Sequence, residues 1–291
     1  SQFVLEALDI QKVESERKKT SAIETIERFA PRKNSVSLKP VVNPEAKLIN
    51  LSYYHMDDYL TCPLKYKYVN ILRVPIMEHH TVIYGRAMHM AVSRYFQFKM
   101  AGKNLDLGGL LDTFRSSFNP QGFLDEKHQE ARLAVGEEAL IRFFNQEETQ
   151  GSQPLFIEKE FSFIFENNKI IGRFDRVDKG KDGVVIMDFK TSEIKTQSSA
   201  DKRVKESMQL VLYALAYKNI FGDYPCRVAL YFLESGIIGS AVVEQPALEK
   251  LKENIRQVSA GLRQQNFKAT PEYMACTYCA YNQICPSAMI K

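Results

Sequence analysis

The sequence predicts an α/β fold in which helices flank a mixed central sheet, with its core elements in the order αβββαβ. Three observations support this class. Helical segments precede a group of three extended runs, two of these runs form a hairpin around a short turn, and an apolar helix separates them from two later strands. Such an order favours helices packed on the faces of a sheet.

The 291 residues allow one large domain, or one domain with an appendage. The beginning of the chain is strongly charged with apolar residues at helical spacing, and residues 31–45 are rich in Pro, Ser, Asn and Lys, as linkers are. We therefore expect residues 1–46 to be a charged helical segment and a linker. Residues 47–291 are expected to form the main domain.

Helices are predicted to fill the first part of this domain. Ser52 is a good N-cap for a helix that carries Cys62, and Pro63 must kink or restart that helix. A second helix is expected over residues 85–99, and amphipathic helices over residues 105–148.

The first strand is predicted from Leu155 to Phe165, because apolar residues alternate along it. Glu158 and Glu160 fall on its other face. Glu160 is a candidate peripheral acid for a metal site, and a surface glutamate is the alternative interpretation.

The next two strands form a hairpin around the turn at residues 180–183. The second arm begins with the β-branched and apolar run Val184-Val-Ile-Met187. A four-residue loop places Asp175 directly opposite Asp188, with the two Cβ atoms about 5 Å apart. Lys190 shares the strand face of Asp188, because side chains alternate along a strand. Two carboxylates and an ammonium group should therefore converge.

Directly opposed carboxylates repel one another unless a cation lies between them, and hard divalent cations such as Mg²⁺ prefer oxygen ligands. The alternative is an exposed hairpin whose Asp and Lys side chains screen one another. The apolar run that leads into Asp188 favours a metal site, because a buried, ionised carboxylate must be paired or coordinating.

The remaining elements complete the fold. They are a helix over residues 209–221, strands over 226–233 and 237–243, and a helix over 247–265. Gln209 and Tyr213 share one face of the first of these helices, four residues apart. A core tyrosine beside a solvated glutamine is the alternative to a functional pair.

At these residues the chain resembles the PD-(D/E)XK nuclease superfamily, and particularly the nuclease domains of the RecB and AddB recombination proteins. The resemblance implies a restriction-endonuclease-like core and a Mg²⁺- or Mn²⁺-dependent deoxyribonuclease, an exonuclease more than an endonuclease, that acts in DNA repair or recombination. It implies that Asp175, Asp188 and the backbone carbonyl of Phe189 hold the metal. Lys190 would position or activate water.

Two further motifs extend the resemblance. The G-x-x-x-H helix of the family is similar to Gly85-Arg-Ala-Met-His89, which implies that His89 is an imidazole ligand of the metal; a structural histidine is the alternative. The Q-x-x-x-Y element of the family is similar to Gln209-Leu-Val-Leu-Tyr213. The resemblance therefore places Gln209 and Tyr213 in the catalytic site.

Three of the five cysteines form a Cys-x2-Cys-x5-Cys motif at residues 276–285, whereas Cys62 and Cys226 stand alone. Structural zinc sites use four ligands in clustered pairs, and the second pair is missing here, although zinc remains an alternative. The start of the chain lacks an apolar signal segment, so a cytoplasmic location is expected, where disulfides are disfavoured. Cys226 is expected to be a small buried hydrophobe.

The split between Cys62 and the C-terminal motif resembles the iron–sulfur staple of the AddB nuclease and of CRISPR-associated spacer-acquisition nucleases. The resemblance implies a four-iron four-sulfur cluster with four cysteine ligands, Cys62, Cys276, Cys279 and Cys285. Cys62 and Cys276 are 214 positions apart, so this staple would restrict the unfolded chain strongly.

The expected partner is DNA, as single strands or ends. A net charge of +4 is too small to indicate nucleic-acid binding. Basic residues alternate with tyrosines over residues 65–73, which suits phosphate contacts and base stacking, or else a solvated helix face with tyrosines packed inward. The opening Ser1-Gln-Phe-Val-Leu-Glu6 resembles the end of the motor region in UvrD-like helicases. This implies a helicase motor in the same chain or a partner chain; no membrane partner is expected.

Three functions remain open at this point. They are a DNA nuclease, a non-catalytic DNA-binding module of nuclease fold, and a zinc-stapled interaction domain. The presence of Asp175, Asp188 and Lys190 together favours the nuclease, because a degenerate copy would be expected to have lost at least one of them.

Overall fold

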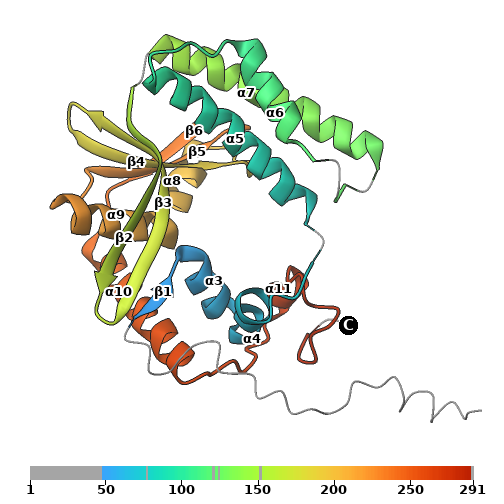
Figure 1. Cartoon of the computed structure of the whole chain (residues 1–291), viewed down its shortest axis with the longest axis vertical. Helices are drawn as coiled ribbons and strands as arrows, with labels where there is room; N and C mark the ends of the chain where they lie inside the picture. The colour runs from blue at the N-terminus through green and yellow to red at the C-terminus, as the bar shows by residue number, and fades with distance from the viewer. Residues whose placement is uncertain (1–47, 77, 120–121, 124, 151–152, 290–291) are drawn as a thin grey trace, which may run out of the picture. The chain divides into compact units, whose positions relative to one another are not determined.

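The computed structural model describes residues 48–76, 78–119, 122–123, 125–150 and 153–289. Within these residues, six strands form one mixed sheet with helices on both faces (Figure 1). The strands are β1 (Ile49–Leu51), β2 (Pro154–Phe165), β3 (Asn168–Gly180), β4 (Gly183–Lys190), β5 (Arg227–Phe232) and β6 (Ile237–Ala241). The predicted α/β class is confirmed. The charged segment and linker expected at residues 1–46 lie outside the described residues.

The helices pack against the two faces of the sheet. They are α3 (Tyr53–Thr61), α4 (Pro63–Tyr66), the π-helical turn η1 (Lys67–Ile71), α5 (His80–Met100), α6 (Leu107–Ser117), α7 (Glu126–Gln150), α8 (Gln197–Lys205), α9 (Met208–Phe221), α10 (Gln245–Arg263) and α11 (Tyr273–Thr277). No helix in the described ranges combines the length and apolar content that crossing a bilayer requires.

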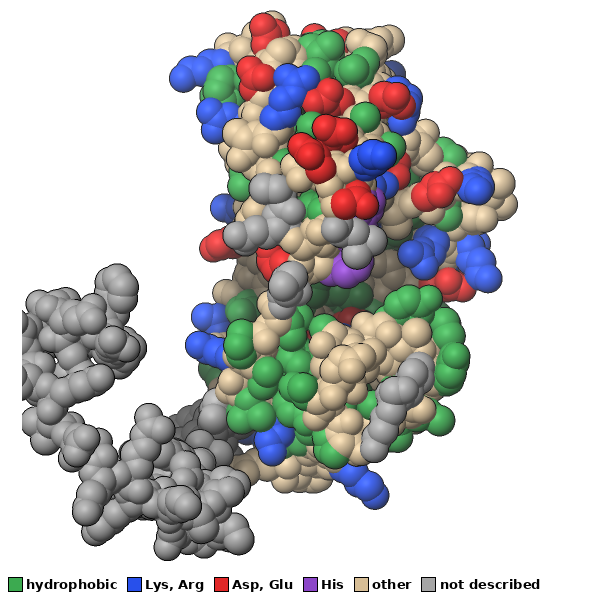
Figure 2. Space-filling view, turned by 90° about the vertical axis from the view of Figure 1, so that its right-hand side faces the viewer, with side chains coloured by type: hydrophobic (Ala, Val, Ile, Leu, Met, Phe, Trp, Pro, Cys, Tyr) green, Lys and Arg blue, Asp and Glu red, His purple; other side chains and the backbone are tan. Residues whose placement is uncertain are grey.

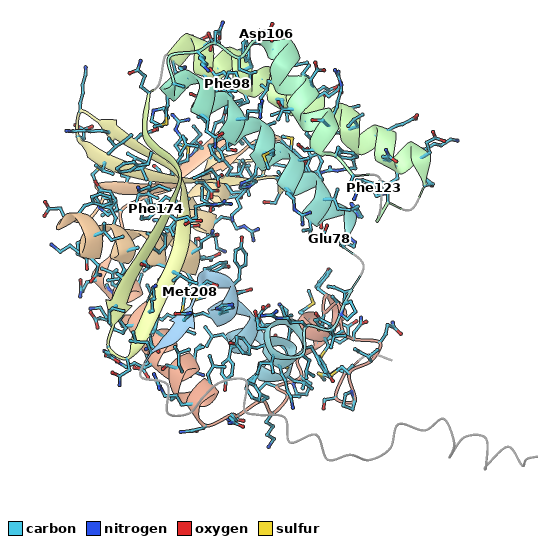
Figure 3. All side chains as sticks on the ribbon, viewed as in Figure 1. Glu78, Phe98, Asp106, Phe123, Phe174 and Met208 are labelled. Carbon is cyan, nitrogen blue, oxygen red and sulfur yellow. The ribbon has the colours of Figure 1, made fainter. Side chains whose placement is uncertain are left out.

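Two hydrophobic cores lie on opposite faces of the sheet. One joins α3, α8, α9 and α10 to the strands, and the other joins α5, α6 and α7 to them. Along β5, Leu230 belongs to the first core and Tyr231 to the second, because successive side chains point to opposite faces. Figure 3 labels Phe174 on the sheet, Met208 at the start of α9 and Phe98 on α5.

The sheet has an open stretch beside β3. β2 pairs with nearly the whole length of one side of β3. On the other side, β1 pairs in parallel with Asn168–Ile170 and β4 pairs antiparallel with Arg176–Gly180. Among the described strands, none pairs with residues 171–175 on that side. Because α3 follows β1 directly, its first turn lies at this opening.

The hairpin has the register that the sequence predicts, with a tighter turn. Arg176 pairs with Met187, and Gly180 pairs with Gly183, which is the predicted register up to the residues beside Asp175 and Asp188. Two residues, not four, form the loop between the strands. Gly183 adopts φ = 126°, a conformation that side-chain-bearing residues rarely reach, and two-residue loops suit the twist of paired strands.

The elements that were not predicted include β1 and α8. β1 contains only Ile49–Leu51, which is too short for alternation to be recognised. α8 is mostly polar and buries only Ala200 and Val204 against the sheet. Both elements form because of tertiary packing, since neither β1 nor α8 has a strong local sequence signal.

Candidate metal centre and active site

A pocket of about 760 Å³, including its open mouth, lies at the opening between β1 and β4. It is lined by all six side chains proposed for catalysis, His89, Asp175, Asp188, Lys190, Gln209 and Tyr213, and by Phe189. These residues come from α5, β3, β4 and α9, so the fold brings distant segments to one point. On the face shown in Figure 2, the surface is hollowed between a charged part and a largely apolar part, with histidine at the rim.

Asp188 is almost fully buried at the end of β4, where its two oxygens have different surroundings. Its Oδ1 accepts a hydrogen bond of 2.8 Å from Nε2 of Gln209. Its Oδ2 lies 2.8 Å from Nζ of Lys190 and forms an ion pair with it. A buried carboxylate needs a positive charge beside it, so this group is suited to bind a cation.

Gln209 connects the other polar groups of the pocket. Its Oε1 accepts from Nζ of Lys190 at 3.0 Å, and its Nε2 also donates to the hydroxyl of Tyr213 at 2.8 Å. Burial alone would lower the pKa of Lys190, but the charge and hydrogen bond of Asp188, together with smaller contributions from Tyr54 and Asp175, outweigh it and raise that pKa. The lysine is therefore held as an ammonium group in a fixed position.

Asp175 and His89 form the second half of the site. Oδ2 of Asp175 accepts from the Phe189 N–H at 3.2 Å and lies 3.5 Å from Nδ1 of His89. Burial, and then the charge of Asp188, raise the pKa of Asp175 well above its usual range. Burial lowers the pKa of His89, which favours the neutral imidazole that metals bind.

Glu158 is a site residue that the sequence reasoning missed. Its carboxylate lies within 4.8 Å of ligand atoms of both His89 and Asp175. Glu158 has φ = 51°, which is a left-handed backbone conformation. Phe156 and Phe161 both contact the same hydrophobic core although an odd number of positions separates them, so the regular alternation of side chains along β2 is interrupted between them. Simple alternation therefore could not locate Glu158. Glu160, the acid that the sequence suggested instead, is exposed and does not line this pocket.

The donor atoms fit a hard divalent cation. His89, Glu158 and Asp175 are the one group of three such side chains gathered within 4.8 Å in the described residues. The sequence-based set contained Asp188 in place of Glu158. Asp188 is turned toward Lys190 and Gln209, because these groups hold it and because the two aspartates repel one another. Asp188 nevertheless lines the same pocket, with its Oδ2 paired to Lys190.

Asp175→Asn is expected to stabilise the protein when divalent metals are chelated. The raised pKa means that ionisation of Asp175 opposes folding. The free energy of unfolding at pH 8 should therefore rise in the variant. Urea denaturation in EDTA measures it.

The pH dependence of this difference tests its cause. Below the ordinary carboxyl pKa, Asp175 is protonated in the folded and unfolded states, and the two proteins should be equally stable. As pH rises, the unfolded chain ionises first, so the wild type loses stability until its folded pKa is passed. Asp182→Asn, in the exposed turn of the same hairpin, is the matched control. A stability difference that is independent of pH would contradict the assignment.

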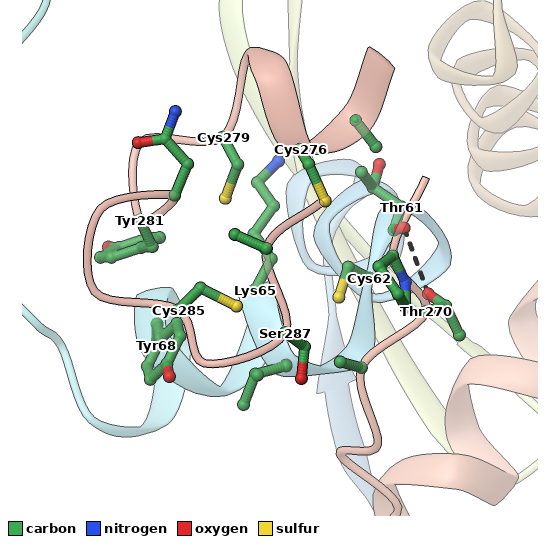
Figure 4. A pocket seen from close by; sticks show the side chains of 16 residues that line it. Thr61, Cys62, Lys65, Tyr68, Thr270, Cys276, Cys279, Tyr281, Cys285 and Ser287 are labelled. Carbon is green, nitrogen blue, oxygen red and sulfur yellow. Dashed lines mark hydrogen bonds between the residues drawn. The ribbon is translucent and has the colours of Figure 1, made fainter. Parts of the chain in front are cut away.

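A second pocket gathers four of the five cysteines. Cys62 from the junction of α3 and α4 lies with Cys276, Cys279 and Cys285, and in Figure 4 their thiols point into a common space. The predicted break at Pro63 produces this junction: α3 ends at Thr61 and α4 begins at Pro63. Cys226 lies elsewhere, half-buried against Gly183.

The surroundings of Cys62 favour a thiolate. Burial would raise the pKa of Cys62, but hydrogen bonds from the backbone of Thr270, Lys65 and Leu64 outweigh it, and the pKa is lowered. Lys65 also lines the pocket, with its ammonium group 2.9 Å from Asp58. Within the described residues, no three of the four thiols lie within 4.8 Å of one another.

The tyrosines that follow Cys62 pack into the protein. Tyr66 is buried and stacks on Phe267, and Tyr68 contacts the ring of Tyr281 beside the cysteine pocket. The second interpretation of this segment, with tyrosines packed inward, therefore describes it. Base stacking by this segment is not supported.

Fold and site together define a class: an α/β protein whose sheet opens beside paired acids, a lysine and a histidine, arranged to bind a divalent cation. The sequence pattern of the PD-(D/E)XK nuclease superfamily matches residues 50–286, and the chain belongs to that superfamily. Among curated proteins, none matches the chain.

Two solved structures illustrate the fold. The chain is similar to a protein from Eubacterium rectale that carries a provisional exonuclease designation, with a TM-score of 0.50 and 14% identity over 82% of this chain and 88% of that one. A second structure, SSO0001, has a TM-score of 0.35 and 14% identity, covering 78% of this chain and 95% of that one. At this identity the first likeness concerns the fold alone.

Proposed function

We propose that the protein is a Mg²⁺- or Mn²⁺-dependent DNA nuclease that hydrolyses phosphodiester bonds. The observation that carries the proposal is the meeting of Asp175, Asp188, Lys190 and His89 in one pocket at the opening of the sheet. Membership of a nuclease superfamily supports the reaction class.

The proposed ion is held by His89, Asp175, Asp188 and the backbone carbonyl of Phe189, with Glu158 as an additional ligand. When bound, such an ion supplies charge neutralisation at the phosphate and lowers the pKa of water. Binding it would also offset the burial and the repulsion from Asp188 that raise the pKa of Asp175. The acids therefore remain ionised at neutral pH.

Lys190 is proposed to hold the attacking water against the scissile phosphate. Its ammonium group is already fixed by Asp188 and Gln209, so little side-chain ordering remains for the reaction. Gln209 is a positioning residue that holds Asp188 and Lys190 in register, and the hydroxyl of Tyr213 accepts from Gln209. Deletion of the Gln209 side chain should lower the rate less than deletion of the Lys190 side chain.

The cysteine pocket is proposed to hold a four-iron four-sulfur cluster on Cys62, Cys276, Cys279 and Cys285. The proposal is supported by the pocket that Cys62 lines together with the three C-terminal cysteines, and by the resemblance of their arrangement to iron–sulfur staples. A single zinc ion is the alternative occupant.

The biological setting is proposed from the resemblance of the motifs to RecB and AddB nuclease domains. The protein would act on single-stranded DNA or DNA ends, as an exonuclease, in repair or recombination. A helicase motor in the same or a partner chain would supply the strand.

Chelation of divalent metal is expected to abolish cleavage. End-labelled single- and double-stranded DNA is incubated with wild-type protein and Mg²⁺, Mn²⁺ or EDTA, and products are resolved on a denaturing gel. Cleavage should appear with either metal, vanish in EDTA and return when Mg²⁺ is restored. Cleavage that continues in EDTA would refute the metal-dependent mechanism, and absence of cleavage with both metals would refute the nuclease.

A further inference from the structure

A groove continues from the active-site pocket along β3. It encloses about 1130 Å³, including its open mouth, and shares five wall residues with the pocket: Ser52, Tyr54, Ile171, Gly172 and Arg173. Farther along, Lys169, Ser162 and Glu160 line it. The pocket and the groove therefore form one continuous surface, and Tyr54 lies where they meet.

Tyr54 is an exposed aromatic residue on a rigid support. It is 68% exposed, yet it occupies the first turn of α3. Ser52 caps this turn by accepting from the His55 N–H, while the His55 ring accepts from the Ser52 N–H. The ring of Tyr53 packs edge-on against Tyr54, with centroids 5.3 Å apart. A fixed backbone and a neighbouring ring limit the motion of Tyr54, so stacking on it costs little conformational entropy.

Tyr54 lines the same pocket as Asp188 and Lys190. Its side chain is thus largely open to solvent at the wall of the pocket that holds the proposed catalytic groups. A planar ligand resting on Tyr54 would lie beside the scissile phosphate.

The charges of the groove suit a single phosphate backbone. Arg173 is more than half exposed and pairs with Glu158, and Lys169 is exposed farther along β3. Glu160 is the acidic side chain of the groove wall, so phosphate contacts are expected at Arg173 and Lys169 and not along the whole groove.

We propose that Tyr54 stacks on a nucleobase adjacent to the scissile phosphate, while the strand runs along the groove past Arg173 and Lys169. Bases of a duplex are already stacked and expose only their edges, whereas bases of a single strand are free to stack on an aromatic ring. Tyr54 would therefore select single strands. This inference rests on the proposed nuclease function.

The test measures binding separately from cleavage. Fluorescence anisotropy in EDTA gives the dissociation constant of a labelled single-stranded oligonucleotide for wild type, Tyr54→Ala and Tyr54→Phe. Tyr54→Ala should weaken binding about 5- to 150-fold, the usual effect of losing one base–aromatic stack. Tyr54→Phe keeps the ring and should bind like wild type. Tyr224, another exposed tyrosine, lies in the connection that precedes β5 and lines neither the pocket nor the groove; Tyr224→Ala is the matched control and should have no effect.

Abasic oligonucleotides identify the stacked base. With a single abasic site moved along the strand, one position should weaken wild-type binding, and at that position Tyr54→Ala should cause no further loss. Lys169→Gln should reduce the slope of log affinity against log salt concentration by about 0.7, as expected for one lost phosphate contact on a single strand.

The outcomes are distinguishable. Equal affinities of wild type and Tyr54→Ala for the single strand, or an equal loss at every abasic position, would overturn the stacking inference while leaving a cleaving wild type intact. A larger loss for duplex than for single strands would overturn the selectivity. If wild type binds through Tyr54 but never cleaves, the proposed nuclease function fails and the binding site stands.

Discussion

Asp188→Ala is expected to lower the rate of DNA cleavage by roughly 10³-fold or more. One carboxylate oxygen of Asp188 is paired with Lys190, and the other accepts from Gln209. Alanine removes a proposed metal ligand and the counter-charge of Lys190 together. Loss of several kcal/mol of transition-state stabilisation corresponds to a rate change of this size. Single-turnover cleavage of end-labelled single-stranded DNA in Mg²⁺ measures it.

The control for this variant lies in the same hairpin. Asp182→Ala removes an exposed carboxylate from the turn and should leave the rate unchanged. Circular dichroism and the absorbance of the proposed cluster should be unchanged in both variants, because Asp188 does not line the cysteine pocket. Full activity of a purified, folded Asp188→Ala protein would refute the assignment of this site.

Cys62→Ser is expected to destabilise the protein more than any of the other substitutions. Cys62 is the one cysteine of the pocket that does not belong to the C-terminal motif. Its loss would therefore remove the proposed link between Cys62 and Cys276, which are 214 positions apart in the chain. In the chain-entropy model, a covalent link that closes a loop of that length stabilises the folded state by about 5 kcal/mol. A metal cluster that closes the same loop also stabilises the folded state. The free energy of unfolding, measured in urea, should fall by several kcal/mol relative to the anaerobically purified wild type, and visible absorbance should be lost.

Cys226→Ser is the matched control. Cys226 is also half-buried, but it contacts Gly183 near the hairpin turn and does not line the cysteine pocket. The substitution should leave the visible absorbance intact and change the stability little. If Cys62→Ser and Cys226→Ser unfold alike, or if the wild type contains stoichiometric zinc and no iron, the cluster assignment is wrong.

Local sequence patterns were sufficient for the hairpin. A β-branched run, a short glycine turn and equal offsets from that turn predict the register that sets Asp175 opposite Asp188, and the structure has this register. The same holds for the capped helix after Ser52 and its interruption at Pro63. Each of these features depends on neighbouring residues alone, since caps, proline breaks and turn geometry are short-range effects.

The meeting of Gln209 with Asp188 and Lys190 does not follow from local sequence. Helical spacing places Gln209 and Tyr213 on one face, and a core tyrosine beside a solvated glutamine was equally compatible with that spacing. The hydrogen bonds of Gln209 depend on how α9 packs across the end of β4. Such packing is a long-range property that periodicity does not specify.

The sequence by itself determined the paired acids, the lysine beside them and the cysteine pattern, because these follow from residue type and short spacing. Only the tertiary structure decided that Glu158 joins the site, since the left-handed backbone at that residue reverses the alternation of β2. It also decided that β1 and β4 leave part of β3 uncovered, which opens the pocket and places Tyr54 at its edge. Strand pairing between distant segments produces this opening, and no local pattern encodes it.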